Sequence, residues 1–150
     1  MKDPMIEKDI KIRNAEPSDY HRIISVVPGW WDGRDLTAML PELFFDHFCD
    51  TSFVVEQGTE LIGFLVGFMS QARLQEAYIH FVGVHPDYRK KGIGATLYEN
   101  FFEICRKRGR TIVRSITSPV NTGSIAFHTS MGFQVERGDK EISFTKHLEE

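Results

Sequence analysis

Residues 82–95 read VGVHPDYRKKGIGA. In this stretch an apolar run stops at a proline, passes through a basic turn and enters a helix across two glycines. The N–H groups at a helix start carry about half a positive charge, and glycines allow a phosphate to approach the backbone closely. The side chains of Arg89, Lys90 and Lys91 add further positive charge. The stretch therefore predicts an anion-binding turn that suits a pyrophosphate, although its spacing alone fits an exposed basic turn equally well.

Hydrophobic periodicity places strands and helices on both sides of this stretch. Before it, we expect a strand, a helix that stops at Pro28-Gly29, and a second helix broken or bent at Pro41. Three strands follow, and we expect the last two to be buried on both faces. After the stretch, we expect a long helix, a strand, a short helix and a final hairpin. The expected ranges are 9–14, 17–27, 36–48, 51–56, 60–70, 78–84, 92–108, 110–116, 124–130 and a hairpin that ends at 147. This order predicts an α/β fold with a mixed sheet and helices on both faces.

Length and composition limit the possible classes of protein. The chain of 150 residues predicts a single domain over residues 1–150. A net charge of −3 argues against nucleic acid as a partner. The longest apolar run, 61–69, is too short to cross a membrane, and the charged leader at residues 1–4 lacks the apolar core of a signal peptide. Two cysteines exclude a disulfide framework, so we expect a cytoplasmic protein without a membrane partner.

Several catalytic and binding motifs do not occur. A leucine replaces the third glycine of a dinucleotide fingerprint, and the sequence contains no Walker phosphate loop, no G-x-S-x-G elbow and no H-E-x-x-H pair. His47 and Cys49 are close in sequence, but no second pair of ligands lies near them. A structural zinc site needs four ligands, so we expect no metal.

The stretch Arg89 to Gly94 resembles the R/Q-x-x-G-x-G/A signature of the GNAT N-acetyltransferase superfamily. The preceding residues 82–86 are similar to the strand before that signature, and residues 121–133 resemble the family's Asn…Tyr…Gly-Phe segment. The resemblance implies a GNAT-like mixed, mostly antiparallel sheet of about six to seven strands with helices on both faces. It also implies acetyl-CoA as co-substrate.

The resemblance assigns coenzyme contacts residue by residue. The backbone of Val82, Gly83 and Val84 would pair with the pantetheine arm, beside a β-bulge between residues 78 and 84. Asn121 would contact the coenzyme near that arm. The pyrophosphate would be held by the amides of Arg89, Lys90, Lys91, Gly92, Ile93, Gly94 and Ala95.

Acetyl transfer to an amine calls for a base and benefits from an acid. The family's acid is usually a tyrosine seven residues after the asparagine, and this sequence has His128 there. A neutral imidazole can donate its one N–H, but His128 can equally well only pack beside the coenzyme. For the base, His80 resembles the strand histidine of arylalkylamine N-acetyltransferases, with Glu76 as second choice. If no bulge intervenes, strand alternation places both side chains on the same face of the strand as Val82 and Val84. A core histidine and a water chain remain the alternatives.

The segment Trp30-Trp31-Asp32 lies in a region that borders the acceptor in this family. Tryptophan rings and a carboxylate can hold a cation, or the rings can attach the helices to the core. We expect a small-molecule or peptide amine to be acetylated by direct attack in a ternary complex, and a homodimer is plausible on the resemblance. The rivals are a peptide N-terminal or ribosomal-protein acetyltransferase and a non-catalytic acetyl-CoA sensor of the same fold.

Overall fold

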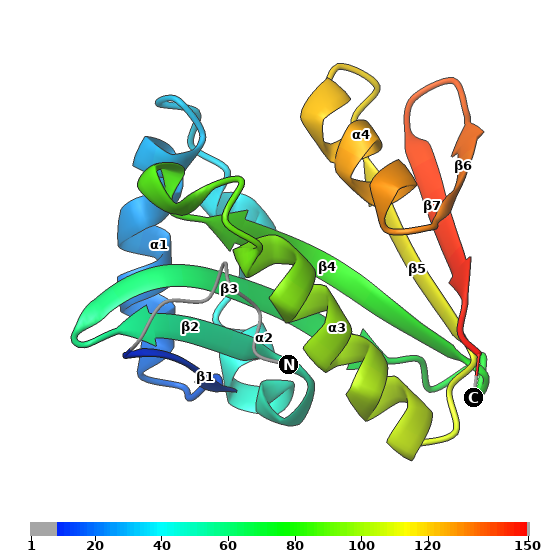
Figure 1. The fold of residues 1–150 in the computed structure, drawn as a ribbon, viewed down its shortest axis with the longest axis horizontal. Helices are drawn as coiled ribbons and strands as arrows, with labels where there is room; N and C mark the ends of the chain where they lie inside the picture. Colours follow the sequence, from blue (N-terminus) through cyan, green and yellow to red (C-terminus); the bar gives the residue numbers. More distant parts are fainter. Residues whose placement is uncertain (1–8, 150) are drawn as a thin grey trace. The chain divides into compact units, whose positions relative to one another are not determined.

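The computed structural model describes residues 9–149, in which strands and helices follow the predicted order (Figure 1). The charged leader expected at residues 1–4 lies outside the described residues. Short 3₁₀ turns occur at Thr37–Met39, Cys49–Thr51 and Pro86–Tyr88. The main elements are β1 Ile10–Asn14, α1 Asp19–Trp30, α2 Leu43–His47, β2 Phe53–Gln57, β3 Glu60–Met69, β4 Glu76–Val84, α3 Ile93–Lys107, β5 Ile112–Thr117, α4 Thr122–Ser130, β6 Gln134–Arg137 and β7 Ile142–His147.

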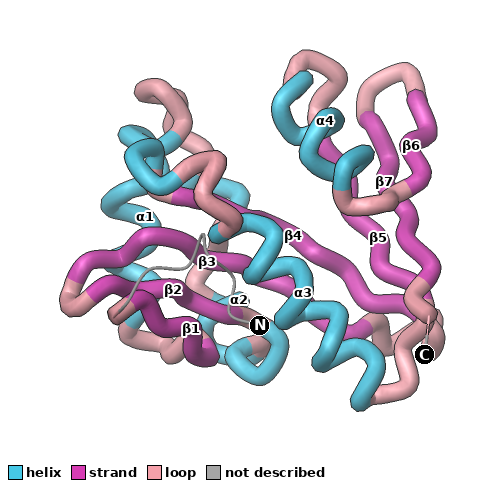
Figure 2. Tube along the Cα trace, viewed as in Figure 1, coloured by secondary structure: helices cyan, strands magenta, loops and turns pink. Residues whose placement is uncertain are grey.

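The described residues form a seven-stranded sheet with the hydrogen-bonded order β1-β2-β3-β4-β5-β7-β6. The pairs β1–β2, β2–β3, β5–β7 and β6–β7 are antiparallel, whereas β4 and β5 are parallel. Figure 2 distinguishes these strands from the helices and loops that connect them. The predicted mixed, mostly antiparallel sheet is therefore confirmed.

The chain forms two compact units, each made of two segments. One contains the described residues up to Gly67 together with Phe81–Phe101, and the other contains Phe68–His80 together with the described residues from Phe102 onward. Strands β1 to β3 and helix α1 lie in the first unit, whereas β5, α4, β6 and β7 lie in the second. The expectation of a single domain over residues 1–150 stays a prediction.

Helices cover both faces of the sheet in the first unit. On one face, Ile23 and Val27 of α1 belong to the same buried cluster as Phe64 and Val66 of β3. On the other face, the side chains of Ile93 and Leu97 in α3 lie against Gly63, where an added Cβ would be 2.9 Å from Ile93 Cγ2. The absence of a side chain at Gly63 therefore lets the first turns of α3 lie close to β3.

Two local predictions were wrong. Helix α1 does not stop at Pro28-Gly29 but continues to Trp30, where the amide of Trp31 donates to the Val27 carbonyl at 3.1 Å. Burial of Trp30 in the core accompanies this last turn, so tertiary packing outweighs the missing proline N–H. Strand β4 alternates half-buried and buried side chains, so only one of its faces is fully buried.

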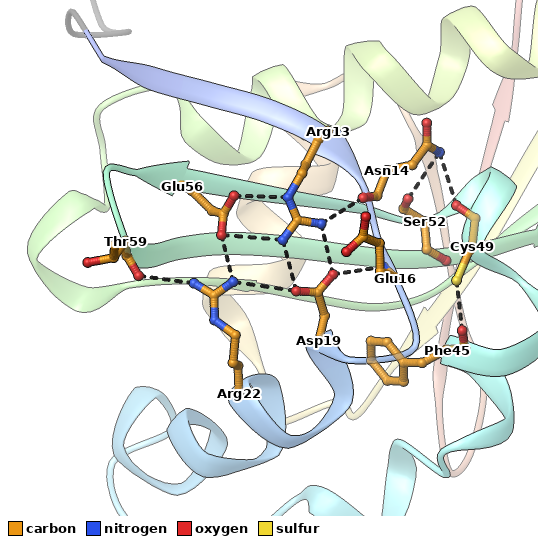
Figure 3. A network of polar contacts seen from close by, with 10 residues as sticks. All are labelled: Arg13, Asn14, Glu16, Asp19, Arg22, Phe45, Cys49, Ser52, Glu56 and Thr59. Carbon is orange, nitrogen blue, oxygen red and sulfur yellow. Dashed lines mark hydrogen bonds and ion pairs between the residues drawn. The ribbon is translucent and has the colours of Figure 1, made fainter.

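A network of charged side chains attaches α1 to β1 and β2 (Figure 3). Arg13 donates two hydrogen bonds of 2.9 Å to the carboxylate of Asp19 and a third, also 2.9 Å, to Glu56. Arg22 donates to Glu56 at 2.6 Å. Burial alone would raise the pKa of Asp19, but the hydrogen bonds from Arg13 and the Glu16 amide hold that pKa below its usual value. The network thereby fixes the start of α1 against the sheet.

Replacing Asp19 with asparagine removes the charge that faces Arg13 and Arg22. We expect D19N to lower the free energy of unfolding by about 2 kcal/mol, less than for a fully buried pair because the arginines are partly exposed. Since the pKa of Asp19 is lowered by folding, this loss should shrink as the pH falls below about 4. Urea unfolding at pH 7 and pH 3 measures both effects. The exposed Asp46→Asn serves as control, and an equal effect of the two substitutions would contradict the role of the network.

Candidate active site

The end of β4 lies against two aromatic rings in the first unit. A Cβ added at Gly83 would be 2.6 Å from Phe64 Cε1 and 2.7 Å from Trp31 Cη2, so only glycine permits this packing. The ring of Trp31 also contacts that of Phe81, with centroids 5.0 Å apart. The residue that directly follows α1 is therefore packed onto the strand that leads into the predicted anion-binding turn.

The turn after β4 has an unusual backbone. Lys90 and Gly92 both have left-handed conformations, with φ of 63° and 84°. Left-handed residues in a turn can direct successive amides toward one point and so form an anion-binding nest. Lys90 has a Cβ, so its conformation is strained by about 1–3 kcal/mol, and such strain is typical of functional sites. The amides of Ile93 and Gly94 lie in the first turn of α3, where a helix offers its amides no carbonyl of its own.

The first part of this turn is attached to β2 and β3. His85 accepts a hydrogen bond from the Asp87 amide at 3.0 Å. The hydroxyl of Tyr88 donates to Gln57 at 2.5 Å. Lys91 Nζ lies 5.5 Å from the centroid of the Tyr88 ring. These contacts fix the first part of the turn and place the positive charge of Lys91 over the Tyr88 ring.

The side chain of Arg89 contacts main-chain carbonyls. Its Nε donates to the Val84 carbonyl at 3.2 Å, and one terminal nitrogen donates to the Trp30 carbonyl. The amide of Arg89 donates to the Pro86 carbonyl at 3.5 Å. The guanidinium thus adds charge at the turn while it links β4 to the end of α1.

The three residues of the predicted acceptor segment lie in three different environments. Trp30 is 6% exposed and stacks on Phe64, so its ring packs in the core. Trp31 is half-buried, and Asp32 is exposed with a left-handed φ of 53°. Of these three residues, Trp31 and Asp32 present surface to solvent.

Strand β4 places the two candidate bases on one face. Glu76 and His80 alternate in step with Val82 and Val84, so their predicted parity is confirmed. The burial alternation within β4 continues without a break through residues 78–84, where the resemblance implies a bulge. The parallel ladder with β5 covers Glu76–Tyr78, and the Ile79 carbonyl accepts a hydrogen bond from the Ser115 hydroxyl at 2.9 Å.

Tyr78 lies on the same face of β4, as strand alternation predicts, whereas sequence reasoning did not assign its neighbour Arg114 to the site. Tyr78 stacks on Phe68 and lies opposite Arg114 of β5. Burial raises the pKa of Tyr78, and the negative charge of Glu141 acts in the same direction. Arg114 Nε lies 3.8 Å from Glu76 Oε1. Alternation within β5 is the signal that indicates Arg114, but only the folded chain shows the register in which β5 pairs with β4.

Helix α4 positions the two remaining candidates. Asn121 is the N-cap: its side-chain oxygen accepts the Ser124 amide at 3.1 Å, and its amide nitrogen donates to Thr117. His128 is buried and stacks on Phe144 with ring centroids 3.9 Å apart. Its Nδ1 lies 2.8 Å from the Ser124 carbonyl. A carbonyl oxygen can only accept, so Nδ1 carries the hydrogen of the neutral ring. Burial lowers the pKa of His128, so the protonated form that an acid on Nε2 would need is disfavoured.

No group of three or more histidine, cysteine, aspartate or glutamate side chains within residues 9–149 is arranged to hold a metal ion. Cys105 is buried, and burial raises the pKa of its thiol to about 12. Cys49 donates its S–H to the Phe45 carbonyl. Neither thiol has the lowered pKa of a catalytic cysteine.

The environment of His128 predicts a pH dependence of stability. Its pKa is lowered by folding, so the unfolded chain binds a proton more readily as the pH falls below about 6.5. The free energy of unfolding of the wild type should therefore fall relative to that of His128→Phe between pH 7 and pH 5. Above pH 7 the difference between the two proteins should be constant. Denaturant unfolding at several pH values measures this, and a difference that does not change with pH would contradict the burial of a neutral ring.

Comparison with known proteins agrees with this fold. The sequence profile of the acetyltransferase (GNAT) family matches residues 16–133. An uncharacterized N-acetyltransferase of Methanocaldococcus jannaschii is 36% identical over 97 residues, which cover 62% of this chain and 41% of that protein. The L-2,4-diaminobutyric acid acetyltransferase of Streptomyces coelicolor is 33% identical over 107 residues, which cover 68% of this chain and 62% of that enzyme. This chain thus spans about two fifths to three fifths of the length of these two relatives.

A solved structure extends the likeness to nearly the whole chain. The diaminobutyrate acetyltransferase of Paenibacillus lautus, in complex with L-2,4-diaminobutyric acid and coenzyme A, has a TM-score of 0.73 at 18% identity. The match covers 94% of this chain and 96% of that one, and at this identity it concerns the fold. The profile match covers well over half of the sequence. The chain therefore belongs to the acetyltransferase (GNAT) family.

Proposed function

We propose that the chain is an N-acetyltransferase that moves the acetyl group of acetyl-CoA to the nitrogen of a primary amine. The observation that carries this proposal is the turn between β4 and α3. There, left-handed Lys90 and Gly92 precede the first amides of a helix, within the family signature. Backbone amides and positive side chains at such a turn suit the pyrophosphate of the coenzyme.

The proposed coenzyme contacts follow from these positions. The amides of Lys90 to Ala95 hold the pyrophosphate, and the side chain of Lys90 adds charge; the Arg89 amide, also predicted for this role, instead donates to the Pro86 carbonyl. The backbone of Val82, Gly83 and Val84 lies beside the pantetheine arm. The coenzyme contact that the family resemblance gives to Asn121, the N-cap of α4, stays a prediction. The family membership supports this set, and so does a solved structure of the same fold in complex with coenzyme A.

The proposed reaction is a direct transfer. The amine nitrogen attacks the thioester carbonyl carbon, so a C–N bond forms and the C–S bond breaks. The amine loses a proton, and the departing sulfur takes one as coenzyme A leaves. A main-chain N–H of Val82 or Val84 stabilises the oxyanion. His80 is the proposed base because it lies on the same face of β4, two residues or about 7 Å before Val82.

The acceptor is proposed to be a primary amine on a small molecule or a peptide. The half-buried ring of Trp31 and the exposed carboxylate of Asp32 suit a cation, with about 0.5–2 kcal/mol per cation–π contact. Trp30 is proposed to support this segment from the core. The named activity of the Streptomyces coelicolor relative favours a diamine-type acceptor for the first trials.

A second candidate is a sensor that binds acetyl-CoA without turnover. His128 favours it, since a neutral ring with Nδ1–H on the Ser124 carbonyl has no proton on Nε2 for the departing sulfur. Release of free thiol from acetyl-CoA, measured over a panel of amines, separates the two candidates. An enzyme turns over with at least one amine, whereas a sensor binds acetyl-CoA and releases no thiol.

Replacing Gly94 with valine tests the coenzyme site. A branched side chain at the helix start would occupy the space of the pyrophosphate, so acetyl-CoA affinity should fall at least about tenfold, or about 1.4 kcal/mol. Isothermal titration calorimetry measures the affinity, and circular dichroism checks the fold. Gly29→Val is the control, because a Cβ at Gly29 meets no atom within 4 Å. Unchanged affinity in a folded Gly94→Val protein would remove the coenzyme site from this turn.

Replacing His80 with glutamine tests the base. We expect kcat to fall by roughly 10²-fold, the lower end for loss of a general base, while acetyl-CoA affinity stays within about twofold. Glu76→Gln measures the second candidate in the same assay, and the exposed His47→Gln is the control. Full activity in both His80→Gln and Glu76→Gln would exclude these side chains as bases.

A further inference from the structure

We propose that Arg89 is a positioning residue for the acceptor segment: its side chain holds the end of α1, and with it Trp31 and Asp32, in place. This inference rests on the proposed function. It assigns the arginine of the family signature to the amine side of the reaction, whereas the amides and Lys90 serve the coenzyme side.

The hydrogen bonds of Arg89 support this role. Its Nε donates to the Val84 carbonyl at the end of β4, and a terminal nitrogen donates to the Trp30 carbonyl at the end of α1. The Trp30 bond joins residues 59 positions apart in the sequence. The guanidinium therefore bridges two main-chain segments through its Nε and one terminal nitrogen.

The end of α1 lacks a positively charged donor of its own. The last carbonyls of a helix have no intrahelical donor, and a positive charge there stabilises the helix dipole. The last turn of α1 contains no basic residue, and it also contains Pro28. Arg89 supplies this charge from another part of the chain. Lysine could not bridge both carbonyls in the same way, because only the planar guanidinium presents donors in a fixed fork.

The residues after Trp30 depend on how α1 ends. Trp31 packs on Phe81 and over Gly83, and Asp32 follows in a left-handed conformation. A left-handed aspartate costs about 1–3 kcal/mol and persists where its surroundings impose it. The Gly33 amide closes the segment by donating to the Pro28 carbonyl at 2.7 Å. Loss of the Arg89 bridge would therefore loosen the surface that is proposed to receive the amine.

Tryptophan fluorescence reports on this segment without any ligand. The chain has two tryptophans, Trp30 and Trp31, so emission comes from the segment alone. In Arg89→Ala we expect redder emission and stronger quenching by acrylamide. Arg89→Lys should give an intermediate result, and Lys90→Ala should match the wild type.

Kinetics and calorimetry then separate positioning from phosphate binding. The acceptor is the amine with the fastest thiol release among L-2,4-diaminobutyrate, phenethylamine and a peptide that begins with alanine. Arg89→Ala should raise its KM about tenfold and leave the acetyl-CoA Kd within about twofold, with partial recovery in Arg89→Lys. Lys90→Ala should show the reverse pattern.

Two results would overturn the inference. One is an Arg89→Ala protein that loses acetyl-CoA affinity as strongly as Lys90→Ala with an unchanged KM. The other is tryptophan quenching that is identical in the wild type, Arg89→Lys and Arg89→Ala. Should Arg89→Ala fail to fold, Arg89→Lys alone decides, because it keeps the charge and loses the fork. A wild type that does not bind acetyl-CoA would refute the proposed function, while the ligand-free quenching still tests the bridge.

Discussion

The backbone of β4 meets two aromatic rings at Gly83 with no side chain between them. Phe64 belongs to β3 and Trp31 follows α1. Strands β3 and β4 and the end of α1 therefore meet at Gly83. An added Cβ would come within 3.0 Å of both rings, which would force one of these elements to move. Trp30 then packs on Phe64 and against the ring of His85, the first residue after β4. The proposed acceptor segment and the turn after β4 thus take their positions from the same close approach.

The turn and the acceptor segment share a second property, which is backbone strain. Lys90 and Asp32 are both left-handed residues with a Cβ; Lys90 directly follows Arg89, and Asp32 lies two residues after Trp30, whose carbonyl accepts from Arg89. Such conformations cost free energy and need support from the surrounding structure. The attachment of Tyr88 to Gln57 and of Arg89 to Val84 supplies that support near the turn. In our account, strain and its support orient amides toward an anion before the coenzyme arrives.

The sequence predicted the order of the elements and the turn, because periodicity and a signature of adjacent residues are local properties. It also predicted that Glu76 and His80 share a face with Val82, since alternation follows directly from strand geometry. It failed at Pro28, where burial of Trp30 outweighs the local preference of proline. It could not predict the partners of Arg89 or the tautomer of His128, because these depend on carbonyls and rings that only the folded chain brings close. Gly83 shows both what the sequence predicts and what it does not. Its place on a strand near the coenzyme was predicted, whereas its packing under Trp31 was not.

The central claim is that acetyl-CoA binds along the end of β4 and at the start of α3. Amide chemical-shift mapping tests this most directly, by recording ¹H–¹⁵N spectra of the assigned protein while acetyl-CoA is added. Our account predicts the largest shifts at the amides of Val82, Gly83 and Val84 and at those of residues 90–95. Shifts centred on other parts of the chain, or an unchanged spectrum at millimolar acetyl-CoA, would contradict it.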